Sequence, residues 1–97
     1  MIGERIEQIR IYKNLSRKDL EKRTGIPEQT WRVIETGMLK PNEEHIEALS
    51  KNWPEYKYWL VFGEVIPEAG HISPELEDIR KKRGKARYGA DAIGPKE

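Results

Sequence analysis

The chain contains no cysteine and no apolar run that approaches membrane-spanning length. The missing cysteines exclude disulfide bonds and thiolate metal sites, and they suit a protein of a reducing cytoplasm. The short apolar runs exclude a transmembrane helix. The first ten residues, MIGERIEQIR, have the spacing of an amphipathic helix and lack the features of a signal peptide. With 97 residues, we expect one small cytoplasmic domain followed by a tail.

Patterns of catalysis and metal binding are also missing. The two histidines, His45 and His71, are isolated and lack the paired spacing of metal ligands. No Ser/His/Asp set and no phosphate-binding loop is present, and the carboxylates are scattered over the predicted helix faces. We therefore expect no enzyme activity, no metal and no other cofactor.

The formal net charge of +1 conceals an uneven distribution of charge along the chain. Residues 1–41 hold nine basic residues (Lys or Arg) and six acidic residues (Asp or Glu). Residues 42–79 hold two basic and nine acidic residues. Residues 80–97 are basic again, with seven basic and two acidic residues. A basic front, an acidic middle and a basic tail suit a protein that presents one side to a polyanion.

Residues 16–40 predict two short helices joined by a tight turn at Gly25-Ile26-Pro27. Ser16 and Asp19 have the spacing of a capping box at the start of the first helix. Small or apolar residues one turn apart line the facing sides, with Leu20 and Thr24 in the first helix and Trp31 and Ile34 in the second. A second helix with a polar outer face completes a helix-turn-helix pattern.

Over about residues 2–63 the sequence resembles the Cro and lambda-repressor-like (XRE-type) helix-turn-helix regulators. The resemblance rests on Leu15, Ser16, Leu20, Thr24, Gly25, Ile26, Thr30, Ile34, Glu35, Gly37, Lys40 and Pro41. It implies an all-α fold in which residues 1–63 form a compact five-helix DNA-binding domain. The chain departs from the family at Arg17, where Gln is usual, at Glu21, where a small residue is usual, and at Pro27, where a capping Ser or Thr is usual. Glu21 must therefore bend outward, or the two helices must cross at a more open angle.

The resemblance also implies which side chains contact double-stranded DNA, with residues 28–36 as the helix in the major groove. The implied base contacts are Glu28, Gln29, Arg32 and Val33, and the implied backbone contacts are Arg17, Lys18, Thr36 and Lys40. Gln29 can pair with adenine and Arg32 with guanine or with a phosphate. Glu28 can accept from cytosine or repel wrong sequences, and Val33 can touch a thymine methyl group. Taken singly, each charge is equally consistent with a solvated surface group.

Other residues have two interpretations each. In the family an Arg matching Arg10 pairs with the Glu matching Glu35, whereas the alternative is that both are solvated. Trp31 is expected in the core rather than stacked on nucleic acid. The aromatic segment after Pro54 either completes the core or forms a dimer surface. The resemblance favours a dimer through Tyr56, Trp59 and Phe62, whereas a place in the core remains expected for Trp59 and Leu60 in particular.

Residues 64–97 form a C-terminal extension beyond the resemblance. Ser73 and Pro74 predict the start of a short helix over about residues 74–82. The remaining residues are basic and rich in glycine, which predicts a flexible tail. The tail either follows DNA phosphates or only keeps the protein soluble, and residues 64–97 are a candidate contact for a protein partner.

Together these features predict a homodimeric transcriptional regulator, a repressor of phage or prophage type, that reads an inverted-repeat operator. It would reside in the bacterial cytoplasm, associated with the nucleoid through DNA. One alternative is an antitoxin that represses its own operon. Another is a protein-interaction adaptor that keeps the helix-turn-helix fold without DNA binding, which Glu21 and Glu28 would favour.

Overall fold

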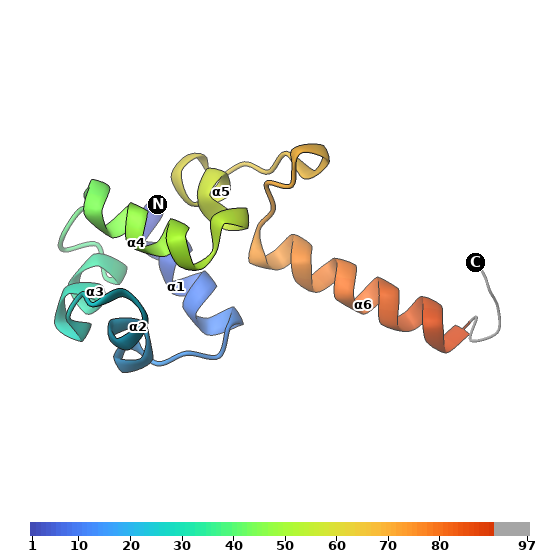
Figure 1. The fold of residues 1–97 in the computed structure, drawn as a ribbon, viewed down its shortest axis with the longest axis horizontal. Helices are drawn as coiled ribbons and strands as arrows, with labels where there is room; N and C mark the ends of the chain where they lie inside the picture. Colours follow the sequence, from blue (N-terminus) through green and yellow to red (C-terminus); the bar gives the residue numbers. More distant parts are fainter. Residues whose placement is uncertain (91–97) are drawn as a thin grey trace.

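A computed structural model of the protein describes residues 1–90, with side chains as far as residue 83. This part of the chain is helical and contains no β-strand. The helices are α1 (Ile2–Tyr12), α2 (Arg17–Thr24), α3 (Glu28–Glu35), α4 (Glu43–Asn52), α5 (Lys57–Phe62) and α6 (Pro74–Ala90). Short 3-10 helices at Pro54–Tyr56 and Pro67–Ala69 precede α5 and α6. Helices α1 to α5 gather into a bundle, and α6 extends from it on the side away from α3 (Figure 1). The all-α prediction is confirmed, while the end of the predicted tail, residues 91–97, lies outside the described residues.

Local capping signals set the starts of α2 and α4, and the signal at α2 is the predicted one. Ser16 and Asp19 form both hydrogen bonds of a capping box, 2.9 and 3.0 Å long, and Gly25 ends α2 with a φ of 77°. The backbone N–H of Ser16, which donates to the carboxylate of Asp19, lowers the pKa of Asp19, and the Ser16 hydroxyl lowers it further. Asn42 caps α4 in the same way, with His45 as its reciprocal partner.

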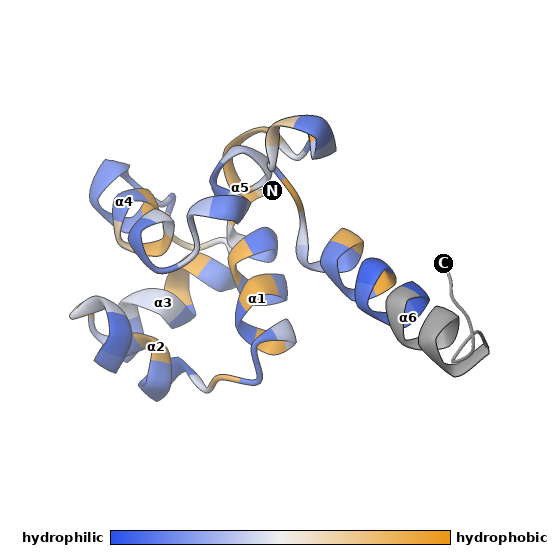
Figure 2. Ribbon diagram, turned by 45° about the vertical axis from the view of Figure 1, so that its right-hand side comes forward, coloured by the Kyte–Doolittle hydropathy of each residue, from blue (hydrophilic) through white to orange (hydrophobic). Residues whose placement is uncertain are grey.

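The core lies where the apolar faces of the first five helices meet (Figure 2). Trp31 is completely buried, and its indole N–H donates to the hydroxyl of Thr24 at 3.2 Å. Its ring meets the ring of His45 edge to face, with the centroids 5.8 Å apart. The interpretation of Trp31 as a core residue is confirmed. The fully or nearly buried apolar residues are Ile6, Ile9, Leu20, Ile26, Trp31, Ile34, Leu49, Trp53, Tyr56, Trp59 and Leu60.

Gly3 allows α1 to approach α3 closely, which the sequence did not indicate. A Cβ atom on Gly3 would lie 2.2 Å from the backbone oxygen of Ile34. Because a backbone atom cannot rotate away, we expect Gly3→Ala to push the helices apart and to lower the free energy of unfolding by about 1–3 kcal/mol. Chemical denaturation measures the loss. Gln8→Ala, at an exposed site of α1, is the control, and equal stability of the two variants would contradict the close contact.

Helix α6 begins as predicted but continues past the expected end near Lys82. The hydroxyl of Ser73 caps it by accepting from the N–H of Leu76 at 3.1 Å. Ion pairs one turn apart, Glu77 with Lys81 and Asp78 with Lys82, support the helix. The glycines farther along make the helix less favourable without ending it, since each costs only about 1 kcal/mol relative to alanine.

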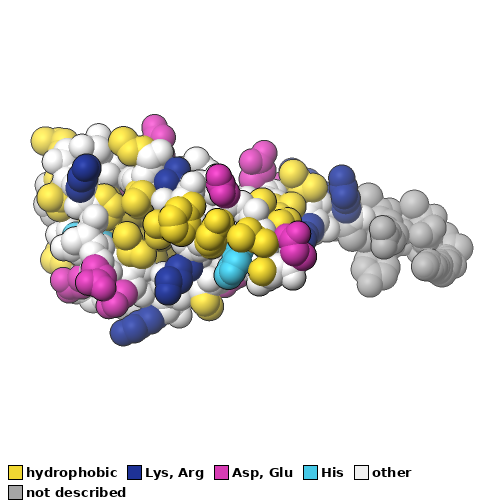
Figure 3. All heavy atoms as spheres, turned by 90° about the horizontal axis from the view of Figure 1, so that it is seen from above, with side chains coloured by type: hydrophobic (Ala, Val, Ile, Leu, Met, Phe, Trp, Pro, Cys, Tyr) yellow, Lys and Arg dark blue, Asp and Glu magenta, His cyan; other side chains and the backbone are white. Residues whose placement is uncertain are grey.

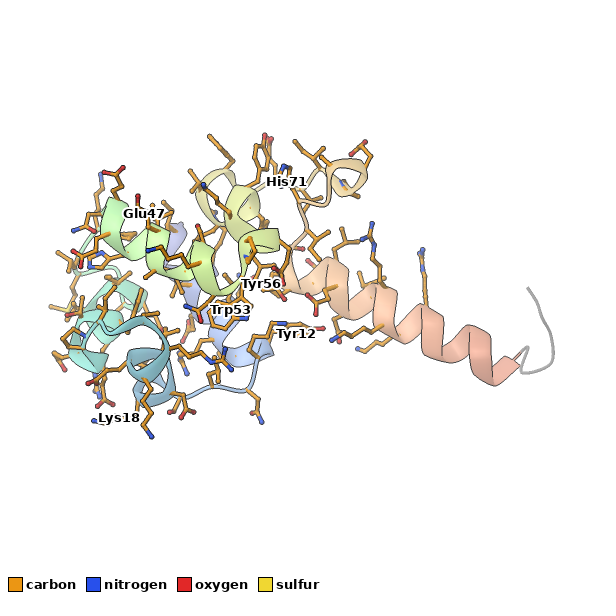
Figure 4. All side chains as sticks on the ribbon, in the orientation of Figure 1. Tyr12, Lys18, Glu47, Trp53, Tyr56 and His71 are labelled. Carbon is orange, nitrogen blue, oxygen red and sulfur yellow. The ribbon has the colours of Figure 1, made fainter. Side chains whose placement is uncertain are left out.

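Glu77 attaches the first turns of α6 to the bundle. It accepts a 2.6 Å hydrogen bond from the hydroxyl of Tyr56 and lies 3.5 Å from the ammonium group of Lys13. Burial and this hydrogen bond raise the pKa of Tyr56, so the phenol stays protonated and donates. Burial alone would raise the pKa of Glu77, but hydrogen bonds from Tyr56 and Lys81 outweigh it and lower that pKa. Tyr12 and Tyr56 both lie beside the start of α6 (Figure 4).

Candidate nucleic-acid interface

Helix α3 has one buried side and one exposed side. Trp31 and Ile34 are completely buried, whereas Gln29 and Arg32 are exposed one turn from each other. Glu28 and Val33, the other two residues predicted to contact bases, are partly buried on the same helix. The four side chains predicted for base contacts therefore follow a single helix whose opposite side is anchored in the core.

The start of α3 is held by a side chain from α2. Pro27 precedes the helix and offers no capping side chain. Instead, Oε1 of Glu21 accepts a hydrogen bond from the backbone N–H of Glu28 at 3.0 Å. The two departures from the family pattern therefore compensate each other, since the carboxylate at Glu21 replaces the cap that Pro27 lacks. Residue spacing alone did not reveal this pairing, although both departures were visible in the sequence.

The end of α3 is held by Glu35, whose side chain is 1% exposed. Arg10 donates two hydrogen bonds to its carboxylate, from Nε at 2.8 Å and from Nη2 at 3.0 Å. Arg17 donates a third from Nε at 3.0 Å. Glu35 therefore joins the first residue of α2 and the last turn of α1 to the end of α3.

The side chains predicted to contact the DNA backbone occupy different environments. Lys18, Thr36 and Lys40 are exposed, and Lys18 lies on the outer side of α2 (Figure 4). The hydroxyl of Thr36 donates to the backbone oxygen of Val33 at 3.2 Å. Arg17 is only 28% exposed and its Nε is engaged by Glu35, so it differs from the three exposed residues.

The predicted dimer residues are divided by the structure between core and surface. Tyr56 is 1% exposed and Trp59 is 9% exposed, because both pack into the core beneath α5. The dimer prediction is therefore corrected for Tyr56, and for Trp59 the core alternative is the one observed. Phe62 is 62% exposed and packs against Tyr58, with the ring centroids 4.8 Å apart.

The described residues offer little for other kinds of site. Within residues 1–83, the part whose side chains the structure describes, no three His, Asp or Glu side chains come together in a way that could hold a metal ion. No helix in this part combines the length and apolarity needed to cross a membrane. Every buried side-chain nitrogen and oxygen there has a hydrogen-bond partner. The exposed side of α3, with Lys18 and Lys40 beside it, is therefore the strongest candidate for a functional site.

Comparison with known proteins identifies a relative. No protein-family model matches the chain. Repressor protein C of Escherichia phage P2 is 30% identical over 95 residues, which cover 96% of this chain and 96% of that protein. The similarity therefore covers most of the residues after the bundle as well as the bundle itself. The chain belongs to the family of Repressor protein C of Escherichia phage P2.

Proposed function

We propose that the protein is a transcriptional repressor that binds double-stranded DNA in a sequence-specific manner and has no enzyme activity. The observation that carries the proposal is the exposed row of Gln29 and Arg32 on α3, opposite the buried Trp31 and Ile34. Its relative from phage P2 is named a repressor. A helix anchored on one side and polar on the other suits insertion into the major groove.

In this proposal α2 and α3 act as a helix-turn-helix unit. Arg32 donates two hydrogen bonds to guanine and Gln29 forms a pair of hydrogen bonds with adenine, since these side chains match the donor and acceptor patterns of those bases. Glu28 accepts from cytosine, and Val33 contacts a thymine methyl group. Both are partly buried in the free protein, so they reach only the bases nearest to α3.

Phosphate contacts hold the same unit in place on the duplex. Lys18, Thr36 and Lys40 are exposed around α3 and approach the backbone directly. The Nε of Arg17 is engaged by Glu35, so its phosphate contact uses the Nη edge of the guanidinium. Arg17 in this proposal joins the DNA backbone to the buried end of α3.

The proposed homodimer uses an apolar surface formed by α5, the segment after it and α6. Phe62, Val65 and Ile79 are 62%, 38% and 41% exposed. A groove of about 420 Å³ between α5 and α6 is lined partly by Val65, Leu76 and Ile79. From above the molecule, hydrophobic side chains form a continuous band (Figure 3). Contact between two such surfaces would bury side chains that a monomer leaves in water.

Residues 1–63 are the proposed DNA-binding domain, and residues 64–97 are the extension that contributes to the dimer or to a further protein contact. A repressor of this kind would act in the bacterial cytoplasm on the nucleoid.

Selection of binders from a random-sequence duplex pool tests the proposal at near-physiological salt. A motif with two half-sites about one DNA turn apart, roughly 34 Å, is expected for a dimer. The recovered motif shows whether the half-sites are inverted, and recovery of no motif would reject the function.

Replacement of Arg32 by alanine is the sharper test of direct base reading. We expect Arg32→Ala to reduce discrimination at one base position by about 1–3 kcal/mol while leaving the thermal midpoint unchanged. Competition binding against single-base operator variants measures the loss. Arg80→Ala removes the same charge from an exposed site of α6 and is the matched control. Equal discrimination by the two variants would show that Arg32 does not read a base.

A further inference from the structure

The carboxylate of Glu21 lies between two parts of the proposed DNA surface. Its Oε1 accepts from the backbone N–H of Glu28 at 3.0 Å and lies 3.9 Å from Nζ of Lys18. The side chain is 37% exposed, so its charge is accessible to solvent. A negative charge therefore stands beside both the first residue of α3 and a lysine proposed to contact phosphate.

This position changes what the start of α3 offers to a polyanion. Free N–H groups and the helix dipole often make a helix start favourable for a DNA phosphate. Here Glu21 takes the N–H of Glu28, and Pro27 has no N–H to donate. A phosphate that approached this end would meet a carboxylate in place of a free donor, and the two negative charges would repel each other.

We infer that Glu21 has two roles, as the positioning residue that caps α3 and as a charge that limits DNA affinity. Repulsion of phosphate acts on every sequence alike, so it weakens nonspecific binding, which depends on phosphate contacts. Stable binding then requires the base contacts of α3. This inference rests on the proposed DNA binding, whereas the capping role stands on the hydrogen bond itself.

Glu21→Gln separates the two roles because an amide oxygen still accepts the hydrogen bond but carries no charge. We expect the variant to keep the wild-type thermal midpoint. We expect it to bind a nonspecific duplex about 3- to 30-fold more tightly at low salt, about 50 mM, with the gain shrinking as salt rises. Glu68→Gln, at an exposed site of the 3-10 helix before α6, makes the same change of net charge and is the control.

The outcomes are distinguishable. If the wild type binds DNA and Glu21→Gln binds no more tightly than Glu68→Gln, the affinity-limiting role is overturned. If neither the wild type nor any variant binds DNA, the proposed function is overturned and the affinity-limiting role is overturned with it.

Glu21→Ala removes the hydrogen-bond acceptor as well as the charge, and we expect it to lower the thermal midpoint. A midpoint equal to that of Glu21→Gln would overturn the capping role.

Discussion

Replacement of Glu35 by alanine is expected to lower the free energy of unfolding by about 3–5 kcal/mol. The Glu35 carboxylate is 1% exposed and accepts three hydrogen bonds from Arg10 and Arg17. Its removal takes away the buried carboxylate that two guanidinium groups, 13% and 28% exposed, share. Such a loss is large for a domain whose total stability is on the order of 5–15 kcal/mol.

Urea denaturation followed by circular dichroism measures this loss. The control is Glu7→Ala, because Glu7 lies 3.9 Å from Arg10 but its side chain is 43% exposed, and we expect a change within about 1 kcal/mol. Glu35→Gln keeps the shape of the side chain and should fall between the two. Similar stabilities for Glu35→Ala and Glu7→Ala would show that the buried pair contributes nothing to holding α3.

Replacement of Trp31 by alanine is expected to cost a similar amount, about 3–5 kcal/mol. The indole is completely buried, so its removal opens a cavity among α2, α3 and α4. The hydroxyl of Thr24 loses the indole N–H that donates to it, and the ring of His45 loses its aromatic neighbour. Because Gln29 and Arg32 stand on the same helix, we also expect a loss of sequence-specific DNA binding.

A graded series distinguishes packing from hydrogen bonding at this site. Trp31→Phe retains much of the buried ring but not the indole N–H, so its loss of stability should be clearly smaller than that of Trp31→Ala. Ile11→Ala removes an apolar side chain that is 62% exposed and should change stability by less than about 0.5 kcal/mol. Chemical denaturation of all three variants measures the series. Equal losses for Trp31→Ala and Ile11→Ala would be incompatible with a core tryptophan.

Several features of the site could be predicted because they depend on neighbours in the sequence. The capping box of Ser16 and Asp19 and the stop at Gly25 follow from local backbone chemistry. The burial of Trp31 and Ile34 follows from helical periodicity, and this leaves Gln29 and Arg32 on the outer side. The exposed side of α3 was thus predictable from spacing alone.

Other features depend on residues that are brought together only by folding. Spacing gave no indication that Glu21 replaces the cap missing at Pro27, or that Gly3 lies against the backbone of Ile34. Tyr56 was expected at a dimer surface, but its hydroxyl donates to Glu77 of α6 and its ring packs in the core. These contacts join residues that are 7 to 31 positions apart along the chain.

By itself, the sequence determined that this protein is helical, where most of its helices begin, and which side of α3 is polar. Each of these follows from interactions within one or two helical turns, which are the same in any fold. Only the tertiary structure decided which aromatic rings remain exposed, how α3 is held at both ends, and that Arg17 divides its guanidinium between Glu35 and the surface. Those outcomes depend on the distances between helices, and these are set by the packing of all side chains at once.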